Sequence, residues 1–157
     1  MNEAEAAMRA VLPDYSTGRR QRIGCTEVKS YTIHWTCLLP QHGPGMKHTR
    51  AIALEPWQQA IVDEHPWPLI RGLIHSDGCR VTNWTTATNS SGEIKRYEYP
   101  RYLFTNESDD IRKIYSDTLD AVGVDWKPTR RGTDFYHVSV ARKASVALMD
   151  EHIGPKY

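Results

Sequence analysis

The clearest helical pattern of apolar positions follows Ser108. Side chains suited to burial recur there at i, i+3, i+4, i+7, i+8 and i+11, which places them on one face of a helix. These residues are Ile111, Ile114, Tyr115, Thr118, Leu119 and Val122. Ser108 is a good N-cap, and Gly123 is typical of the residue just beyond a helix end. The pattern predicts a helix from about residue 109 to residue 122.

Alternating and β-branched segments on both sides of this helix predict four strands in two pairs. The strands are predicted at Arg80 to Ala87, Ile94 to Thr105, Val124 to Arg130 and Phe135 to Ala141. The first pair is joined by Asn89-Ser90-Ser91-Gly92 and the second by Arg131-Gly132-Thr133-Asp134, both of which are turn-forming sequences.

Three further helices are predicted, and two of them flank the strands. Pro68 to Asp77 begins with a first-turn proline and ends before Gly78, which we expect to be a left-handed C′ residue. A last helix is predicted at about Arg142 to His152, and an earlier one from Pro56 to about Glu64. From Pro68 the order is α-β-β-α-β-β-α. Residues 55–157 are therefore predicted to form an α+β domain with a curved, four-stranded antiparallel sheet covered by helices on one face.

The first third of the chain is basic and less regular. Residues 1–50 hold seven Lys/Arg and four Asp/Glu, and the Pro/Gly-rich stretch from Pro40 to Gly45 is turn-prone. We treat residues 1–54 as a small basic segment, with short helices predicted at residues 1–12 and Thr26 to Trp35. The latter resembles the end of a helix-turn-helix, so the segment is either a divergent helix-turn-helix or an unrelated basic arm. Its cations could contact phosphates; they are Arg19, Arg20, Arg22 and Lys29.

Composition narrows the class of protein. Hydrophobic residues make up 39% and charged residues 25% of the 157 residues, which is typical of a folded chain. A formal charge of +1 excludes a histone-like polycation but leaves room for a local basic patch. Three cysteines do not form a disulfide scaffold, and no apolar run approaches the length of a membrane span. We therefore expect a cytoplasmic protein that does not enter the membrane.

One face of the predicted helix at Pro68 to Asp77 is narrow and built from small or apolar side chains. Leu69, Gly72, Leu73 and Ser76 lie on it at i, i+3, i+4 and i+7, and small residues permit close approach of a second backbone. Asp77 is the last helical residue, where a carboxylate is unfavourable at the negative end of the helix dipole. Something else must compensate it, and a divalent cation is one answer.

The nine residues Ile70-Arg71-Gly72-Leu73-Ile74-His75-Ser76-Asp77-Gly78 resemble the LAGLIDADG motif of homing endonucleases and their relatives. Six of the nine positions match in type, whereas Arg71 and His75 depart from the motif. The predicted order of elements is also the one that this family's core domain uses.

The resemblance implies that two motif helices pack side by side and bring one acidic residue each to a metal centre. This chain has one copy of the motif, so the arrangement would need a homodimer through Leu69, Gly72, Leu73 and Ser76. Asp77 would then be the ligand of Mg²⁺, which activates water and stabilises the leaving oxygen. Lys95, Lys127 and Arg131 are the candidate electrostatic supports for the transition state.

The sheet offers a candidate face for double-stranded DNA. Alternation along Ile94 to Thr105 places basic and aromatic side chains on one side, and later strands add further polar groups. The candidate DNA-binding residues are Arg80, Lys95, Tyr97, Tyr99, Arg101, Lys127, Arg131 and His137. The face of the first strand, which carries Arg80, is ambiguous from the pattern. The alternative is an ordinary solvated sheet surface.

Two functional classes follow. One is a site-specific, metal-dependent DNA endonuclease that acts as a homodimer. The other is a DNA-binding transcriptional regulator that keeps the same fold without cutting. A structural module with no role on DNA is a third interpretation.

Overall fold

The structure is a computed structural model that describes residues 3–131 and 134–154, and of these it does not describe the side chains of residues 47, 131 and 134–136. The chain divides into two compact units, one ending at Gly43 and the other beginning at Pro44. The division falls inside the Pro40 to Gly45 stretch. No helix of the described ranges is long and apolar enough to span a membrane.

The first unit is a helix followed by a β-hairpin. It contains α1 (Glu3–Val11), β1 (Thr17–Arg22), β2 (Cys25–Ser30) and the short α2 (Trp35–Leu38). β1 and β2 pair antiparallel through a turn in which Gly24 has a φ of 79°. The predicted helix at Thr26 to Trp35 is therefore wrong, and the helix-turn-helix interpretation fails with it. Alternation of Thr26 and Val28 and the turn glycine favour a strand over a helix.

α1 is tied to this hairpin by a buried carboxylate. Glu5 is only 4% exposed and accepts hydrogen bonds from Thr17 Oγ1 at 2.9 Å and Arg19 Nε at 2.6 Å. The hydrogen bond from Arg19 is the main cause of the lowered pKa of Glu5. Arg22 and Lys29 both pair with Glu27 on β2. Three of the four cations that were predicted to meet phosphates thus already have carboxylate partners within the unit.

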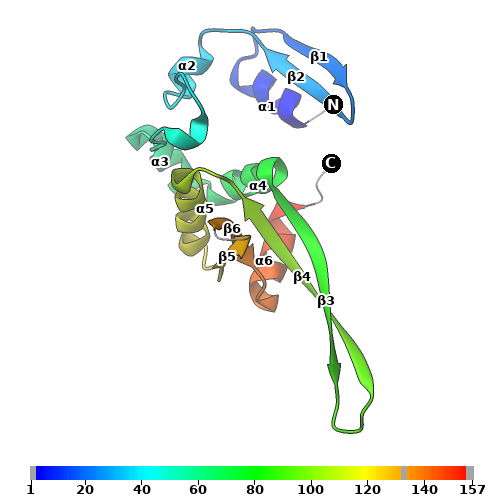
Figure 1. Ribbon diagram of the computed structural model, residues 1–157. Coiled ribbons are helices and arrows are strands. Elements are labelled where there is room, and N and C mark those ends of the chain that lie inside the picture. The colour runs from blue at the N-terminus through cyan, green and yellow to red at the C-terminus, as the bar shows by residue number, and fades with distance from the viewer. Residues whose placement is uncertain (1–2, 132–133, 155–157) are drawn as a thin grey trace. The chain divides into compact units, whose positions relative to one another are not determined.

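The second unit has the mixed α+β architecture that the sequence predicts. Its elements are a short 3₁₀ turn (Lys47–Thr49), α3 (Pro56–Glu64), α4 (Pro66–Asp77), β3 (Gly78–Thr88), β4 (Ile94–Thr105), α5 (Asp109–Ala121), β5 (Lys127–Arg131), β6 (Asp134–Val140) and α6 (Lys143–Ile153). The four strands form one antiparallel sheet in the order β3-β4-β6-β5 (Figure 1).

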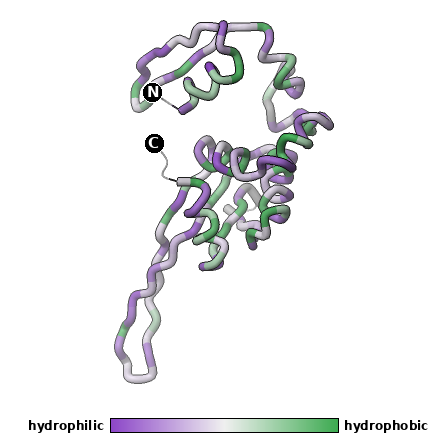
Figure 2. Tube along the Cα trace, turned by 180° about the vertical axis from the view of Figure 1, so that it is seen from behind, coloured by the Kyte–Doolittle hydropathy of each residue, from purple (hydrophilic) through white to green (hydrophobic). Residues whose placement is uncertain are grey.

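The core lies between the sheet and the helices α4, α5 and α6. Tyr102 and Phe104 of β4 and Val138 and Val140 of β6 are buried there, and Phe104 packs against Tyr115 with ring centroids 4.4 Å apart. The buried residues are Ile70, Ile74, Tyr102, Phe104, Tyr115, Leu119, Val124, Val138, Val140, Val146, Met149 and Ile153. Figure 2 shows the green, hydrophobic positions gathered in this packed part, while the far half of the β3–β4 hairpin is largely purple and white.

Local signals around α5 are confirmed. Ser108 caps the helix by accepting a hydrogen bond from the Ile111 amide, and Gly123 has a φ of 73° just beyond the helix end. Burial of Tyr115 and Leu119 on one stripe is the cause of the apolar spacing in the sequence.

The prediction of a left-handed Gly78 is wrong. Gly78 has a φ of −111° and a ψ of 174°, which is extended backbone, and it begins β3 directly after α4. A Cβ at this position would lie 2.7 Å from Ile74 Cδ1 and 2.8 Å from Ile74 Cα. Glycine is needed here because the start of β3 passes so close to Ile74 of α4 that no side chain fits at residue 78.

Candidate nucleic-acid interface

The sheet face that points away from Tyr102 and Phe104 is defined here as the open face. Residues paired across antiparallel strands share a face, so the registers assign every strand position to one side. The open face carries Asn83 and Thr85 on β3, Lys95, Tyr97, Tyr99 and Arg101 on β4, His137 and Ser139 on β6, and Lys127 and Thr129 on β5. The sequence-predicted residues Lys95, Tyr97, Tyr99, Arg101, Lys127 and His137 thus lie on one face of the sheet.

Positive charge exceeds negative charge on the described part of the open face. Among its paired and described side chains, Lys95, Arg101 and Lys127 are cationic and none is acidic. Lys95 is nearest the hairpin turn, where its Nζ lies 3.9 Å from the Glu93 carboxylate. Such a surface attracts a polyanion.

Polar and aromatic groups lie beside these cations. The guanidinium of Arg101 lies over the Tyr99 ring, 5.3 Å from its centroid. Thr105 Oγ1 and His137 Nδ1 are 2.6 Å apart across neighbouring strands. The open face therefore mixes cations, aromatic rings and hydrogen-bonding groups, which is the composition that groove contacts to DNA require.

The β3–β4 hairpin extends well past the other strands (Figure 1). It pairs over eleven positions, whereas β6 pairs with β4 only from Tyr102 to Thr105. At about 3.3 Å per residue the paired length is about 35 Å, close to one turn of B-DNA. The major groove admits a two-stranded ribbon of this kind.

Arg80 lies on the opposite face, contrary to its predicted place among the DNA contacts. Its guanidinium donates to both carboxylate oxygens of Asp150 on α6, at 2.6 Å and 2.8 Å, and the Tyr102 hydroxyl donates to the same carboxylate at 2.7 Å. The hydrogen bond from Arg80 holds the pKa of Asp150 below its usual value. Arg80 therefore fastens α6 to the sheet.

The motif helix α4 buries one side against the sheet, and Leu73, predicted on the dimer face, also packs in part against the core of its own chain. Ile70 and Ile74 are 0% and 2% exposed and face the sheet. Gly72 lies on the other side, where an added Cβ would meet no atom within 4 Å. The Ser76 hydroxyl donates to the Leu73 carbonyl at 2.9 Å and so presents no free donor. Within the described second unit, the side of α4 around Gly72 has room for a close neighbour.

Asp77 is exposed at the end of α4, and its carboxylate has a partner that sequence reasoning missed. Asn106 Nδ2 donates to Asp77 Oδ2 at 2.9 Å, while Asn106 Oδ1 accepts from the Ser108 amide at 2.9 Å. The pairing of Gly78 with Phe104 brings the two segments together. An amide donor therefore compensates the carboxylate at the negative end of the helix.

The described residues of one chain supply only some of the oxygen ligands that Mg²⁺ needs. The described residues contain no group of three His, Cys, Asp or Glu side chains placed to hold a metal ion. Mg²⁺ keeps several waters and is commonly bound through one or two carboxylates plus substrate phosphates. Asp77 fits such a site only if a second copy of the chain and the DNA supply the remaining oxygens.

The other predicted catalytic residues do not gather at Asp77. Phe104 of β4 pairs with Gly78, the residue after Asp77. Lys95 lies nine residues from Phe104 along β4, a distance of about 30 Å. Cys79, two residues after Asp77, lies in one row across the sheet with Leu103, Ser139 and Lys127. Lys127 is therefore three strand spacings, or about 14 Å, from Cys79. The side chain of Arg131 lies outside the described residues. In a single chain, Lys95 cannot support chemistry at Asp77.

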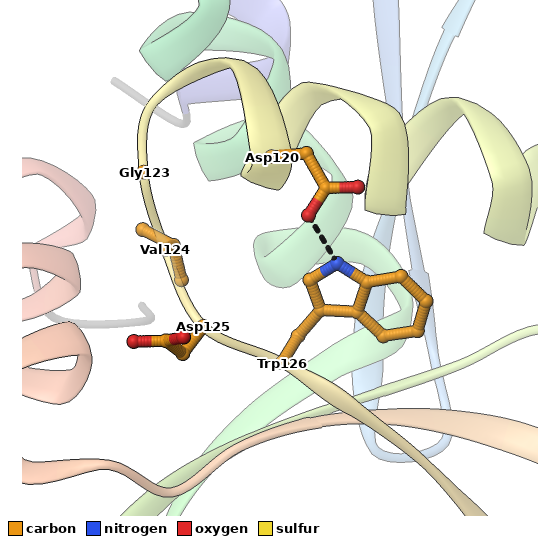
Figure 3. Close-up of a pocket in the computed structure, with 5 residues that line it drawn as sticks. All are labelled: Asp120, Gly123, Val124, Asp125 and Trp126. Atoms are coloured by element: carbon orange, nitrogen blue, oxygen red, sulfur yellow. Dashed lines mark hydrogen bonds between the residues drawn. The ribbon is translucent and has the colours of Figure 1, made fainter.

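A shallow hollow at the end of α5 does not add a site (Figure 3). It is lined by Asp120, Gly123, Val124, Asp125 and Trp126. Trp126 Nε1 donates to Asp120 at 2.7 Å, and Arg142 pairs with Asp125 at 2.6 Å. These polar groups satisfy one another and join the helix end to β5.

The chain matches no protein-family model, and no curated protein resembles it in sequence.

Proposed function

We propose that this protein binds double-stranded DNA along the open face of its second unit. The observation that carries the proposal is the segregation of charge: three cations and two tyrosines lie on a face whose described strand positions hold no carboxylate. The chain as a whole has a charge of only +1, so this distribution is local. Phosphates favour such a face because their binding releases condensed counterions.

Several cations elsewhere in the second unit pair with carboxylates at 2.6–2.7 Å. Arg80 pairs with Asp150, Arg96 with Glu98 and Lys113 with Asp117. Arg96 and Glu98 lie on the other side of the same ribbon that carries Lys95 and Arg101. Arg101, by contrast, has no carboxylate partner among the described residues, and this difference supports a specific role for the open face.

The proposal includes a LAGLIDADG-type fold and a homodimer through the Gly72 side of α4. The motif at residues 70–78, the order α4-β3-β4-α5-β5-β6-α6 and the space beside Gly72 support it. A dimer would place two open faces on one duplex, each with a ribbon about one helical turn long.

Two activities are compatible with DNA binding along the open face: cleavage of the bound DNA, and binding without cleavage. Mg²⁺-dependent cleavage by the homodimer is supported by the exposed Asp77 at the end of the motif helix, and Mg²⁺ would there supply an activated water. Binding without cleavage, as in a transcriptional regulator, is supported by the hydrogen bond that already engages Asp77 and by the distance to Lys95.

The deciding experiment uses the full chain with a randomised duplex library. Bound duplexes are selected without metal, and the enriched sequences are then incubated with Mg²⁺ or with a chelator, for wild type and for Asp77→Asn. Cleavage that needs both Mg²⁺ and Asp77 establishes the endonuclease. Selective binding without cleavage, unchanged in Asp77→Asn, establishes the regulator. Absence of salt-sensitive binding to any duplex overturns the proposed function.

A further inference from the structure

Arg101 is held in an unusual setting on the open face. It lies on β4 opposite Val81 and directly before Tyr102, the first residue of β4 that pairs with β6, where the four-stranded sheet narrows to the projecting ribbon. Its side chain is half-buried, and its guanidinium lies over the Tyr99 ring. The ring and the half-burial therefore restrict the planar fork before any ligand arrives.

Among the residues that the structure describes, Arg101 has no carboxylate partner. Arg101 Nε is buried and makes no hydrogen bond, and no ion pair of Arg101 occurs within the described residues. On the open face, the nearest strand neighbours of Arg101 are Val81, Tyr99 and Leu103. A cation kept among such groups without an acceptor is costly. Because Nε itself is buried, an incoming pair of acceptor atoms would meet the exposed end of this half-buried side chain.

We propose that Arg101 is a specificity-determining residue that reads a guanine in the major groove. This inference rests on the proposed function. Guanine presents O6 and N7 side by side, and a rigid arginine fork donates to both. The contact with the guanidinium makes Tyr99 a positioning residue, because the ring restricts the fork on one side.

A backbone phosphate is the competing acceptor, and the two differ in measurable ways. A guanine contact creates a preference for one base pair, which lysine cannot reproduce because it lacks the fork. A phosphate contact contributes equally on all sequences, and lysine retains most of it. Half-burial, a restricted fork and an apolar setting favour the guanine over the exposed, mobile phosphate contact expected of Lys95 or Lys127.

The test compares selected sequences for the full-length wild type, Arg101→Lys, Tyr99→Phe and Tyr99→Leu, with Lys127→Gln as the matched control on the same face. We expect wild type to prefer a G·C pair at one position by about tenfold or more over the other base pairs. Arg101→Lys should lose that preference while its salt dependence of binding stays the same. Tyr99→Phe should keep the preference, Tyr99→Leu should weaken it, and Lys127→Gln should weaken binding to all sequences alike.

The outcomes separate this inference from the proposed function. If Arg101→Lys selects the same sequence as wild type, or loses affinity uniformly, Arg101 contacts a phosphate and the inference is wrong while DNA binding stands. If wild type shows no salt-dependent binding to duplex DNA, the proposed function fails and the inference fails with it. Far-ultraviolet circular dichroism of each variant confirms that it is folded.

Discussion

Asn106 Nδ2 donates a hydrogen bond to Asp77 Oδ2 at 2.9 Å, and so joins the end of the motif helix to the loop before α5. Asn106 is 5% exposed, and its side-chain oxygen also accepts from the Ser108 amide. The contact links the two segments that meet where α4 passes into β3. A residue predicted as a metal ligand thus has a structural role in the single chain.

Replacing Asn106 should destabilise the second unit. Asn106→Ala removes both hydrogen bonds and leaves the Ser108 amide without its acceptor, so we expect a loss of about 2 kcal/mol in the free energy of unfolding. Urea denaturation measures this. A double-mutant cycle with Asp77→Ala isolates the pair, and a coupling energy of zero would show that the hydrogen bond contributes nothing.

The Arg80–Asp150 pair should make stability depend on acid pH. Because the pKa of Asp150 is lowered in the folded protein, its contribution is complete above the ordinary pKa of 3.8 and is lost as pH falls through the lowered value. Both side chains are partly exposed, so solvent screening keeps this contribution below about 1 kcal/mol. The difference in unfolding free energy between wild type and Asp150→Asn should therefore shrink from pH 7 toward pH 2. A difference that grows in acid would contradict this sign.

Two glycines of the motif should respond in opposite ways to alanine. Gly78→Ala places a Cβ against Ile74 and should cost about 1–3 kcal/mol of unfolding free energy. Gly72→Ala meets no atom within the described unit and should leave the folded chain as stable or slightly more stable, because alanine favours helix. Thermal unfolding of the two variants at low protein concentration checks the contrast. Equal losses would mean that Gly72 is also packed within the chain.

The homodimer is tested at the same position. Gly72→Glu adds bulk and charge on the side of α4 where a second copy is proposed, so the variant should be a folded monomer while wild type is a dimer. Sedimentation velocity with and without duplex DNA measures this, and Gly72→Ala serves as the control for a small change. A wild type that stays monomeric under both conditions contradicts the dimer.

The sequence predicts the second unit well because its signals are local. The stripe around Leu119 and the cap at Ser108 each act within a few residues, and the predicted bounds of β4, Ile94 to Thr105, are those observed. Failure at Gly78 has a different cause: the constraint there is a steric approach to Ile74 that no turn rule describes. In the first unit, the hairpin depends on cross-strand pairing that a helical reading of Thr26 to Trp35 ignores.

In the candidate site, too, local features could be predicted from the sequence and long-range contacts could not. Alternation alone places Lys95, Tyr97, Tyr99 and Arg101 on one side of β4, as the register has them. Distances between elements depend on pairing, so the separation of Lys95 from Asp77 follows only from the sheet. The position of Arg80 and the partner of Asp77 likewise depend on residues far away in the sequence, Asp150 and Asn106.

The most direct test of the account is the salt dependence of duplex binding for two charge-matched double variants. Lys95→Gln with Lys127→Gln removes two cations from the open face, and Arg96→Gln with Lys113→Gln removes two from elsewhere in the same unit. If the open face binds DNA, the slope of log K against log salt should fall by about 0.9 for each lost phosphate contact in the first variant only. Equal slopes in the two variants, or a larger change in the second, would contradict binding along the open face.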